Sequence, residues 1–259
     1  GSPNNFSDKR LIKPQPTTSA AALAKMDIEV TVGVEKGREG SESLKHYESE
    51  LDASGVSVQR GLVDKQVCEA CFVEILRGFD CMLSLPGPMS SSAAERNFMA
   101  IATSRDKVKD PEHRRDFKLP FASVEPLLKA ALTGNLGSML LDALGRDAEL
   151  SELTAIRSLP GAASQDWHAD SSWCATDPRR CTFFFALHDI LEEHMGPTHF
   201  CPNTHAPHCF PDERWIPPTK TLVDNRPCVW FALHAGDAVV FDAFTWHCGG
   251  ANTSKSTRT

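Results

Sequence analysis

The chain has 259 residues, of which 41% are hydrophobic and 24% are charged, so it is long enough to fold as one domain around a sizeable core. A formal net charge of −7, without a concentrated run of Lys or Arg, argues against DNA or RNA as a partner. We find no apolar run that approaches the roughly 18 residues needed to span a bilayer. These features favour a protein that acts on a small molecule.

Nine cysteines, scattered from Cys68 to Cys248, lack the dense spacing of a secreted disulfide scaffold. We therefore expect the protein to be intracellular and to lie in a reducing compartment, the cytoplasm. The opening letters GSPNN resemble a cloning remnant, which leaves room for an organelle-targeting segment that was removed. The single C-x-x-C, Cys68 and Cys71, lies in a helical pattern without a second pair, which favours buried packing thiols over a zinc site.

Residues 1–45 are rich in Pro, Ser, Thr, Gly and charge, which predicts a flexible N-terminal arm, and residues 46–259 then form a single domain. The stretch GVSVQRGLVDKQVCEACFVEILRGF predicts a short strand and an amphipathic helix capped near Asp64. A Leu-rich run from Ser123 to Gly145 predicts two helices, with Ser123 as the cap and Gly145 as the stop. Residues 60–146 are thus expected to be mainly helical.

From residue 151 onward, the pattern changes to short β-rich runs separated by Gly, Pro, Asn and Asp. These runs include ELTAIRSLPG, RRCTFFFALHDI, CVWFAL and DAVVFDAF. The pattern predicts a β core over residues 151–259 of the double-stranded β-helix type, a cupin-like jelly-roll barrel, with helices flanking it.

The letters QDWHAD place His168 and Asp170 two positions apart, so in an extended segment both side chains reach the same point. His247, in GDAVVFDAFTWHCGG, is the best candidate for a third ligand. Two histidines and one carboxylate leave three positions open on an octahedral ion, which is the arrangement of non-haem Fe(II) oxygenases. Alone, an H-x-D is more often a hydrogen-bonded loop.

Three blocks in order carry a resemblance to a known family: QDWHAD, then GPTHFCPNTH at 196–205, then AGDAVVFDAFTWHCGGANTSKSTR at 235–258. Across roughly residues 50–258 the chain resembles the phytanoyl-CoA dioxygenase-like family of Fe(II)/2-oxoglutarate-dependent oxygenases. The resemblance implies Fe(II), 2-oxoglutarate and O2 as cofactors, and His168, Asp170 and His247 as the iron ligands.

By the same resemblance, Arg258 matches the arginine that grips the distal carboxylate of 2-oxoglutarate, for which a guanidinium fork is well suited. Arg179, Arg180 and Arg226 are alternatives for that role, and a solvated surface charge is the ordinary interpretation of Arg258. Related halogenases have a small residue at the carboxylate position, so Asp170 favours hydroxylation.

The surroundings of these residues supply further candidates for contacts to the substrate or to the iron ligands. They are Gln165, Trp167, Trp173, Phe185, Thr198 and His199. Core packing is the ordinary interpretation of Phe183 to Phe185, and a surface turn is that of Thr198, His199, Asn203 and His205.

Histidines and cysteines also gather between His194 and Cys209, which suggests a separate structural zinc site. Because no pair has zinc-finger spacing on both sides, we do not favour it on sequence alone. The six residues are His194, His199, Cys201, His205, His208 and Cys209.

The leading functional hypothesis is a dioxygenase that hydroxylates a small organic molecule, for which a lipid or acyl compound is one option, and releases succinate and CO2. A metal-dependent cupin of lyase or isomerase type would use the three ligands without Arg258. A jelly roll retained as a non-catalytic binding module is the third hypothesis. Neither the oligomeric state nor the substrate can be inferred from the sequence.

Overall fold

The computed structural model describes residues 29–35, 50–83, 98–100, 113–171 and 179–255. The strands are β1 Glu29–Glu35, β2 Val56–Gln59, β3 Phe98–Ala100, β4 Arg114–Lys118, β5 Glu149–Ser158, β6 Arg180–Ala186, β7 Thr198–Cys201, β8 Ala238–Asp242 and β9 Trp246–Gly249. The α-helices are α2 Glu50–Ser54, α3 Lys65–Leu83, α5 Phe121–Leu132, α6 Asn135–Leu144 and α7 Lys220–Asp224, and the short 3-10 turns are η1 Glu193–Met195 and η2 Pro207–Cys209.

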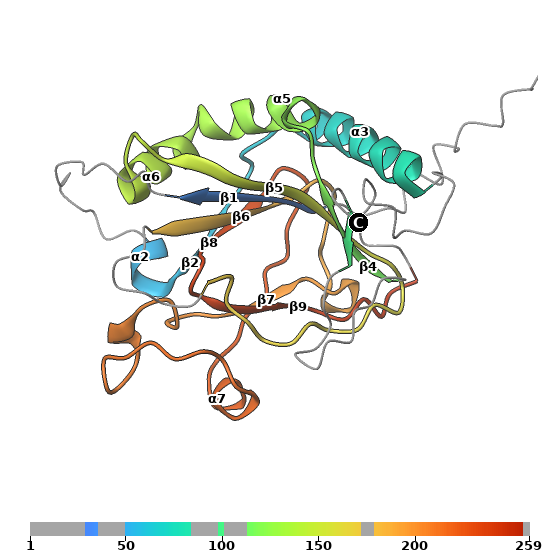
Figure 1. Ribbon diagram of the computed structural model, residues 1–259. Helices are drawn as coiled ribbons and strands as arrows, with labels where there is room; N and C mark the ends of the chain where they lie inside the picture. Colours follow the sequence, from blue (N-terminus) through green and yellow to red (C-terminus); the bar gives the residue numbers. More distant parts are fainter. Residues whose placement is uncertain (1–28, 36–49, 84–97, 101–112, 172–178, 256–259) are drawn as a thin grey trace, which may run out of the picture.

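The strands form two antiparallel sheets (Figure 1). The larger sheet has seven strands in the order β2-β8-β6-β1-β5-β4-β3, and the smaller sheet pairs β7 with β9. Helices α3, α5 and α6 lie along one face of the large sheet, and β7 and β9 lie on its other side (Figure 1). The expectation of a mainly β fold with flanking helices is therefore confirmed.

Alternation along β6 separates the two faces of the large sheet. Phe183 and Phe185 belong to the hydrophobic core that α3, α5 and α6 share with the sheet. Phe184, between them, packs instead with Phe200 and Phe241 in a second cluster. One strand thus supplies both the helix-side core and the wall of the interior between the two sheets.

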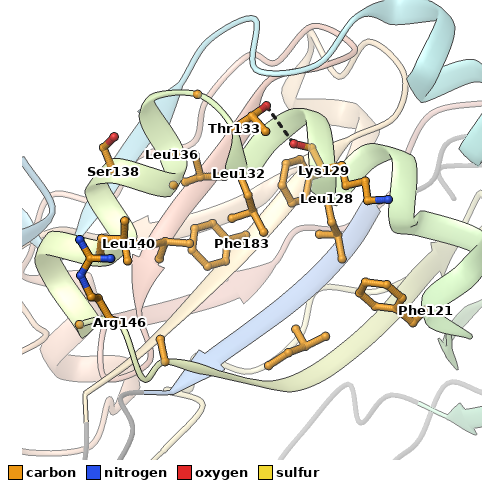
Figure 2. Close-up of a pocket in the computed structure, with 17 residues that line it drawn as sticks. Phe121, Leu128, Lys129, Leu132, Thr133, Leu136, Ser138, Leu140, Arg146 and Phe183 are labelled. Carbon is orange, nitrogen blue, oxygen red and sulfur yellow. Dashed lines mark hydrogen bonds between the residues drawn. The ribbon is translucent and has the colours of Figure 1, made fainter.

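On the helix side of the large sheet, a cavity of about 610 Å³ lies between α5, α6 and the sheet. Its lining is mostly apolar, with Lys129 and Arg146 at its edges, and Figure 2 shows Phe183 and Leu140 among the residues around it. Because Phe183 and Phe185 line this cavity, it lies on the helix side of β6.

Helix boundaries agree with the local sequence signals at two of three positions. Helix α3 begins directly after Asp64, whose carbonyl accepts from Val67 and Cys68, and α6 ends at Gly145 with φ 88°. The positive φ explains the glycine there. Ser123 was wrongly predicted as a cap: α5 begins two residues earlier, after Pro120, and the Ser123 hydroxyl donates to the Pro120 carbonyl.

Two sequence-based expectations about the N-terminal half were wrong in part. Residues 29–35 were assigned to a flexible arm, yet β1 lies in the middle of the large sheet, between β5 and β6. The β-branched residues of EVTVGVE explain the strand, and the polar sequence on both sides obscured the signal. The supposedly helical residues 60–146 also contribute β3 and β4 to the sheet.

The expectation that the cysteines are reduced thiols was wrong for one pair, because Cys201 and Cys228 form a disulfide. It joins β7 to the segment before Val229, whose backbone bonds to Phe200. The described free thiols are Cys68, Cys71, Cys181, Cys209 and Cys248. No helix in the described ranges is long and apolar enough to cross a membrane.

Candidate metal centre

His168 and His247 are held side by side by their own backbones. The amide of His168 donates to the carbonyl of His247 at 2.9 Å, and the amide of His247 donates back at 2.8 Å. The two imidazole rings consequently lie with centroids 4.4 Å apart. A pairing between residues 79 positions apart in sequence thus fixes the first two candidate ligands.

Asp170 joins this pair because its own backbone amide donates to the carbonyl of Ala243, in the turn between β8 and β9. Its Oδ1 lies 3.3 Å from Nε2 of His247. Ligand atoms of His168, Asp170 and His247 all lie within 4.8 Å of one another. The three residues that the sequence singled out are therefore brought together at one point.

Hydrogen bonds fix the tautomer of both histidines. Nδ1 of His168 lies 2.8 Å from the carbonyl of Asp166, and Nδ1 of His247 lies 2.9 Å from the carbonyl of Thr245. Since a carbonyl only accepts, each Nδ1 carries a proton, so Nε2 is the nitrogen that each ring presents to a metal. Metal-binding histidines commonly use their other ring N–H in this way.

The carboxylate of Asp170 is held in its ionised form. Burial opposes ionisation, but His247, His168 and the Thr182 hydroxyl outweigh it, so the pKa of Asp170 lies below its usual value. Thr182 on β6 donates to Oδ2 at 3.0 Å, which leaves Oδ1 directed at His247. Two neutral imidazoles and one carboxylate are a donor set that suits Fe(II).

The strand that carries His247 is braced from beside the metal centre. The buried Arg114 donates to the carbonyls of Gly249 and Gly250 at 3.3 and 2.5 Å, and the amide of Gly249 donates to Oε1 of Gln165 at 2.8 Å. A Cβ at Gly249 would lie 2.6 Å from that Oε1, so a larger residue here would displace the Gln165 side chain. Gln165 thus holds the strand that carries His247.

The other predicted neighbours divide between the two sides of their strands. Thr198 pairs with Gly249 and shares a strand face with Phe200, whose ring lies beside His247. His199 points the other way, and its Nε2 meets the carboxylate of Glu193 at 3.2 Å. Thr198 therefore remains a candidate for substrate contact, whereas His199 is engaged by an acidic residue outside the metal centre.

Two predicted aromatic neighbours are packing residues. Trp167 packs against the cluster of Cys201, Phe210, Val223 and Trp246. Phe185 was wrongly predicted beside the metal, because it faces the helices. The ring that faces the metal centre is that of Phe184, one residue earlier, with its centroid 6.5 Å from that of His247. Trp173 and Arg258 lie outside the described residues.

The alternatives to Arg258 differ in their surroundings. Arg179 is bound by Asp52 at 2.6 Å and by Asp242 at 3.2 Å, and Arg226 lies over the rings of Phe210 and Trp246. Arg180, by contrast, donates to the Ser171 hydroxyl, directly after Asp170. Of these three arginines, Arg180 is therefore the one bound to the metal-binding segment.

Sequence reasoning missed a row of polar residues on the interior face of the large sheet. Thr182 and Glu152 both pair with Gly33 of β1, so they lie in one row on one face, separated by one strand. Burial and then the charge of Asp170 raise the pKa of Glu152, which places it near the metal centre. The polar alternation in SELTAIRS of β5 was the available signal.

Comparison with known families bears on this arrangement. The family model named phytanoyl-CoA dioxygenase matches residues 52–259, a range that contains both histidines and the aspartate. The chain belongs to this family. Its members are Fe(II)/2-oxoglutarate-dependent enzymes, so membership confirms Fe(II), 2-oxoglutarate and O2 as the expected cofactors.

Solved structures of similar fold include three proteins. AviO1 from Streptomyces viridochromogenes is 18% identical with a TM-score of 0.57, over 80% of this chain and 87% of that one. HygX from Streptomyces hygroscopicus, with nickel and 2-oxoglutarate bound, is 12% identical with a TM-score of 0.53, over 80% of each chain. The epimerase SnoN, in complex with Fe3+, alpha-ketoglutarate and nogalamycin RO, is 17% identical with a TM-score of 0.52, over 80% and 77%. At these identities the likeness establishes the fold.

Proposed function

We propose that this enzyme is an Fe(II)/2-oxoglutarate-dependent dioxygenase that hydroxylates a small organic molecule and releases succinate and CO2. The observation that carries the proposal is the convergence of His168, Asp170 and His247, whose ligand atoms all lie within 4.8 Å of one another. Bound iron, with 2-oxoglutarate and O2, supplies the oxidising chemistry at an unreactive C–H bond.

We further propose that the two sheets are the walls of a jelly-roll barrel, with the metal centre between them. The large sheet contributes Thr182 and Phe184, and the small sheet contributes His247 and Phe200. Rings of Phe184, Phe200 and Phe241 lie at 6.5, 6.1 and 4.7 Å from that of His247. These rings exclude water from one side of the centre, which strengthens the electrostatic contacts of Asp170.

The distal carboxylate of 2-oxoglutarate needs a cationic side chain to bind it. We assign this role to Arg258 on the family resemblance, with Arg180 as the alternative because it is bound beside Asp170. Replacing Arg258 with Ala should raise the KM for 2-oxoglutarate by about tenfold or more, since a bidentate charge-assisted contact is lost. Arg146→Ala, at the cavity on the helix side, is the matched control.

The organic substrate is expected to carry polar groups. Strands β4 and β5 carry Asp116, Lys118, Glu152 and Thr154 on the same face of the large sheet as Thr182, and Glu152 lies in the row of Thr182. Burial raises the pKa of Asp116 to about 6, so this carboxyl group gains a proton as the pH falls through about 6. A polar small molecule fits such a wall better than a purely hydrocarbon chain.

Substrate-independent turnover tests the assignment before the substrate is known. The purified chain, supplied with Fe(II), 2-oxoglutarate and O2, should consume O2 and form succinate, and Asp170→Ala should do neither. Absence of succinate from an iron-loaded chain would favour the cupin-type lyase or isomerase. Loss of all metal binding would favour a non-catalytic module.

A second candidate outcome is stereochemical inversion, because SnoN is described as an epimerase. Both reactions consume 2-oxoglutarate, so succinate does not separate them. Once a substrate is found, 18O2 labelling does: hydroxylation places the label in the product, whereas epimerisation leaves the product unlabelled. The proposal of hydroxylation predicts a labelled product.

A further inference from the structure

A second group of metal-binding side chains lies away from the first. His205 precedes the short turn η2, and His208 and Cys209 lie within it. Ligand atoms of these three residues all lie within 4.8 Å of one another. Spacings of three and four residues bring them to one side of the turn. They share no residue with the centre of His168, Asp170 and His247.

The sequence contains six histidines and cysteines between His194 and Cys209, and the structure leaves three of them as candidate ligands. Cys201 is removed because it is in a disulfide with Cys228. His194 and His199 are paired with the carboxylates of Glu192 and Glu193. The remaining set therefore consists of two imidazoles and one free thiol.

His205 is oriented as a metal ligand would be. Its Nε2 lies 3.1 Å from the carbonyl of Asp52, so this nitrogen carries the proton and Nδ1 keeps the lone pair. Nδ1 faces Sγ of Cys209 at 3.8 Å. Gly55 leaves room for the ring, since a Cβ there would lie 2.5 Å from Nδ1.

The separation of the ligand atoms suits a tetrahedral ion. Bonds of about 2.3 Å to sulfur and about 2.0 Å to nitrogen place the two atoms about 3.6 Å apart in a tetrahedron. The observed 3.8 Å between Sγ and Nδ1 is close to that value. The rings of His205 and His208 stand at 86° with centroids 5.7 Å apart, so they do not stack against each other.

We propose that His205, His208 and Cys209 bind a divalent ion of the zinc type, with the fourth position open to water or another small ligand. A thiolate favours zinc over Fe(II), whereas the carboxylate of the first centre favours the harder ion, so the two sites take different metals. Three protein ligands and one open position are the usual arrangement of a reactive zinc site.

The ion would link three parts of the chain near the first centre. His205 is bonded to α2 through Asp52, and Thr204 accepts from the backbone amide of Trp246 at 2.9 Å. Trp246 directly precedes the ligand His247. Zinc at the turn η2 would therefore hold the segment that positions β9, and its removal should loosen the first metal centre without taking a ligand from it.

Cobalt(II) tests the proposal on the full chain, because a thiolate bound to cobalt gives an intense near-ultraviolet charge-transfer band that histidine and carboxylate ligands do not give. We would titrate metal-free protein with Co2+ without added thiols. The band should appear and should saturate at an intensity that corresponds to one thiolate-bound cobalt per chain. It should be lost in Cys209→Ser and need at least about tenfold more cobalt in His208→Ala.

Two controls make the assignment specific. Cys71→Ser removes a buried thiol of the C-x-x-C pair and should leave the band unchanged. Asp170→Ala disables the first centre and should also leave it unchanged, which separates this proposal from the dioxygenase. Absence of the band in the wild type, or its persistence in Cys209→Ser, would overturn the proposal. Because His208 is exposed, His208→Ala should fold and gives an independent answer.

Discussion

Oδ1 of Asp170 lies 3.3 Å from Nε2 of His247, and Oδ2 of the same carboxylate accepts a hydrogen bond from the Thr182 hydroxyl. The hydroxyl thus directs the carboxylate at the metal position. We predict that Thr182→Val weakens Fe(II) binding about tenfold or more, because supporting bonds to metal ligands typically contribute that much. Calorimetric titration of metal-free protein with Fe(II) under anaerobic conditions measures the effect.

Thr133→Val is the matched control, because Thr133 caps α5 with bonds to Lys129 and Ala130, on the helix side of the sheet. It should leave the affinity for Fe(II) unchanged. An unchanged affinity in Thr182→Val would show that Thr182 does not position the carboxylate.

Neighbouring phenylalanines on β6 should differ in effect. Phe184 and Phe185 are both buried, so replacing either with Leu should cost about 1 kcal/mol of unfolding free energy. Only Phe184→Leu should alter iron and 2-oxoglutarate binding, because only its ring lies beside His247. Denaturant unfolding and cofactor titration of both variants test this. Equal cofactor defects would mean that the two faces of β6 are not separated as described.

Asp237 should stabilise the fold in a pH-dependent way. It accepts from the amides of Gly61 and His234 and from Arg60 at 2.7 to 2.9 Å. Burial opposes ionisation, but these donors outweigh it and hold the pKa of Asp237 below its usual value. The stabilisation is therefore present above the unfolded-state pKa of about 3.9 and lost as pH falls through the lower folded-state value.

We predict that Asp237→Asn lowers the unfolding free energy by about 1 to 3 kcal/mol at pH 7, and that the difference shrinks below about pH 4. Urea unfolding at several pH values measures it. Asp224→Asn removes an exposed pair with Lys220 and should change stability by less than about 0.5 kcal/mol. A deficit in Asp237→Asn that grows on acidification would contradict the assignment.

Alkylation should rank the described cysteines. Burial raises the pKa of the Cys68, Cys181 and Cys248 thiols to about 12, so these thiols stay protonated at pH 8. Cys209 is less buried and should react first with iodoacetamide. Peptide mass spectrometry measures the order in which the cysteines are alkylated. Faster modification of Cys248 would show that the thiol beside His247 is exposed to solvent.

The disulfide gives a separate expectation. Cys201 and Cys228 should be alkylated only after reduction, and opening the bond across 27 residues should lower the unfolding free energy by about 3 to 4 kcal/mol. Alkylation of both cysteines without reductant would contradict the pairing.

The metal ligands could be predicted from sequence because their signal is local. The spacing of His168 and Asp170 places both on one face of an extended segment whatever the fold. His247 required only that a strand return to that segment, which the backbone pairing of His168 with His247 achieves. Local spacing suggested the two residues of QDWHAD as candidate ligands, and the family resemblance was needed to assign all three.

Other features depend on contacts that no local pattern encodes. The choice between Phe184 and Phe185 is a matter of strand register, in which one residue exchanges the two faces. The pairing of Cys201 with Cys228, the contact of Thr182 with Asp170 and the insertion of β1 between β5 and β6 all join distant segments. Composition also misled at β1, because polar flanking sequence outweighed a short strand signal.

The most direct test of the central proposal is an anaerobic titration of metal-free protein with Fe(II) and then 2-oxoglutarate, followed by visible absorption. A keto acid that chelates iron gives a charge-transfer band. We predict the band in the wild type, its loss in Asp170→Ala, and a need for about tenfold more 2-oxoglutarate in Arg258→Ala. Iron that binds the wild type but gives no band with 2-oxoglutarate would contradict the dioxygenase assignment.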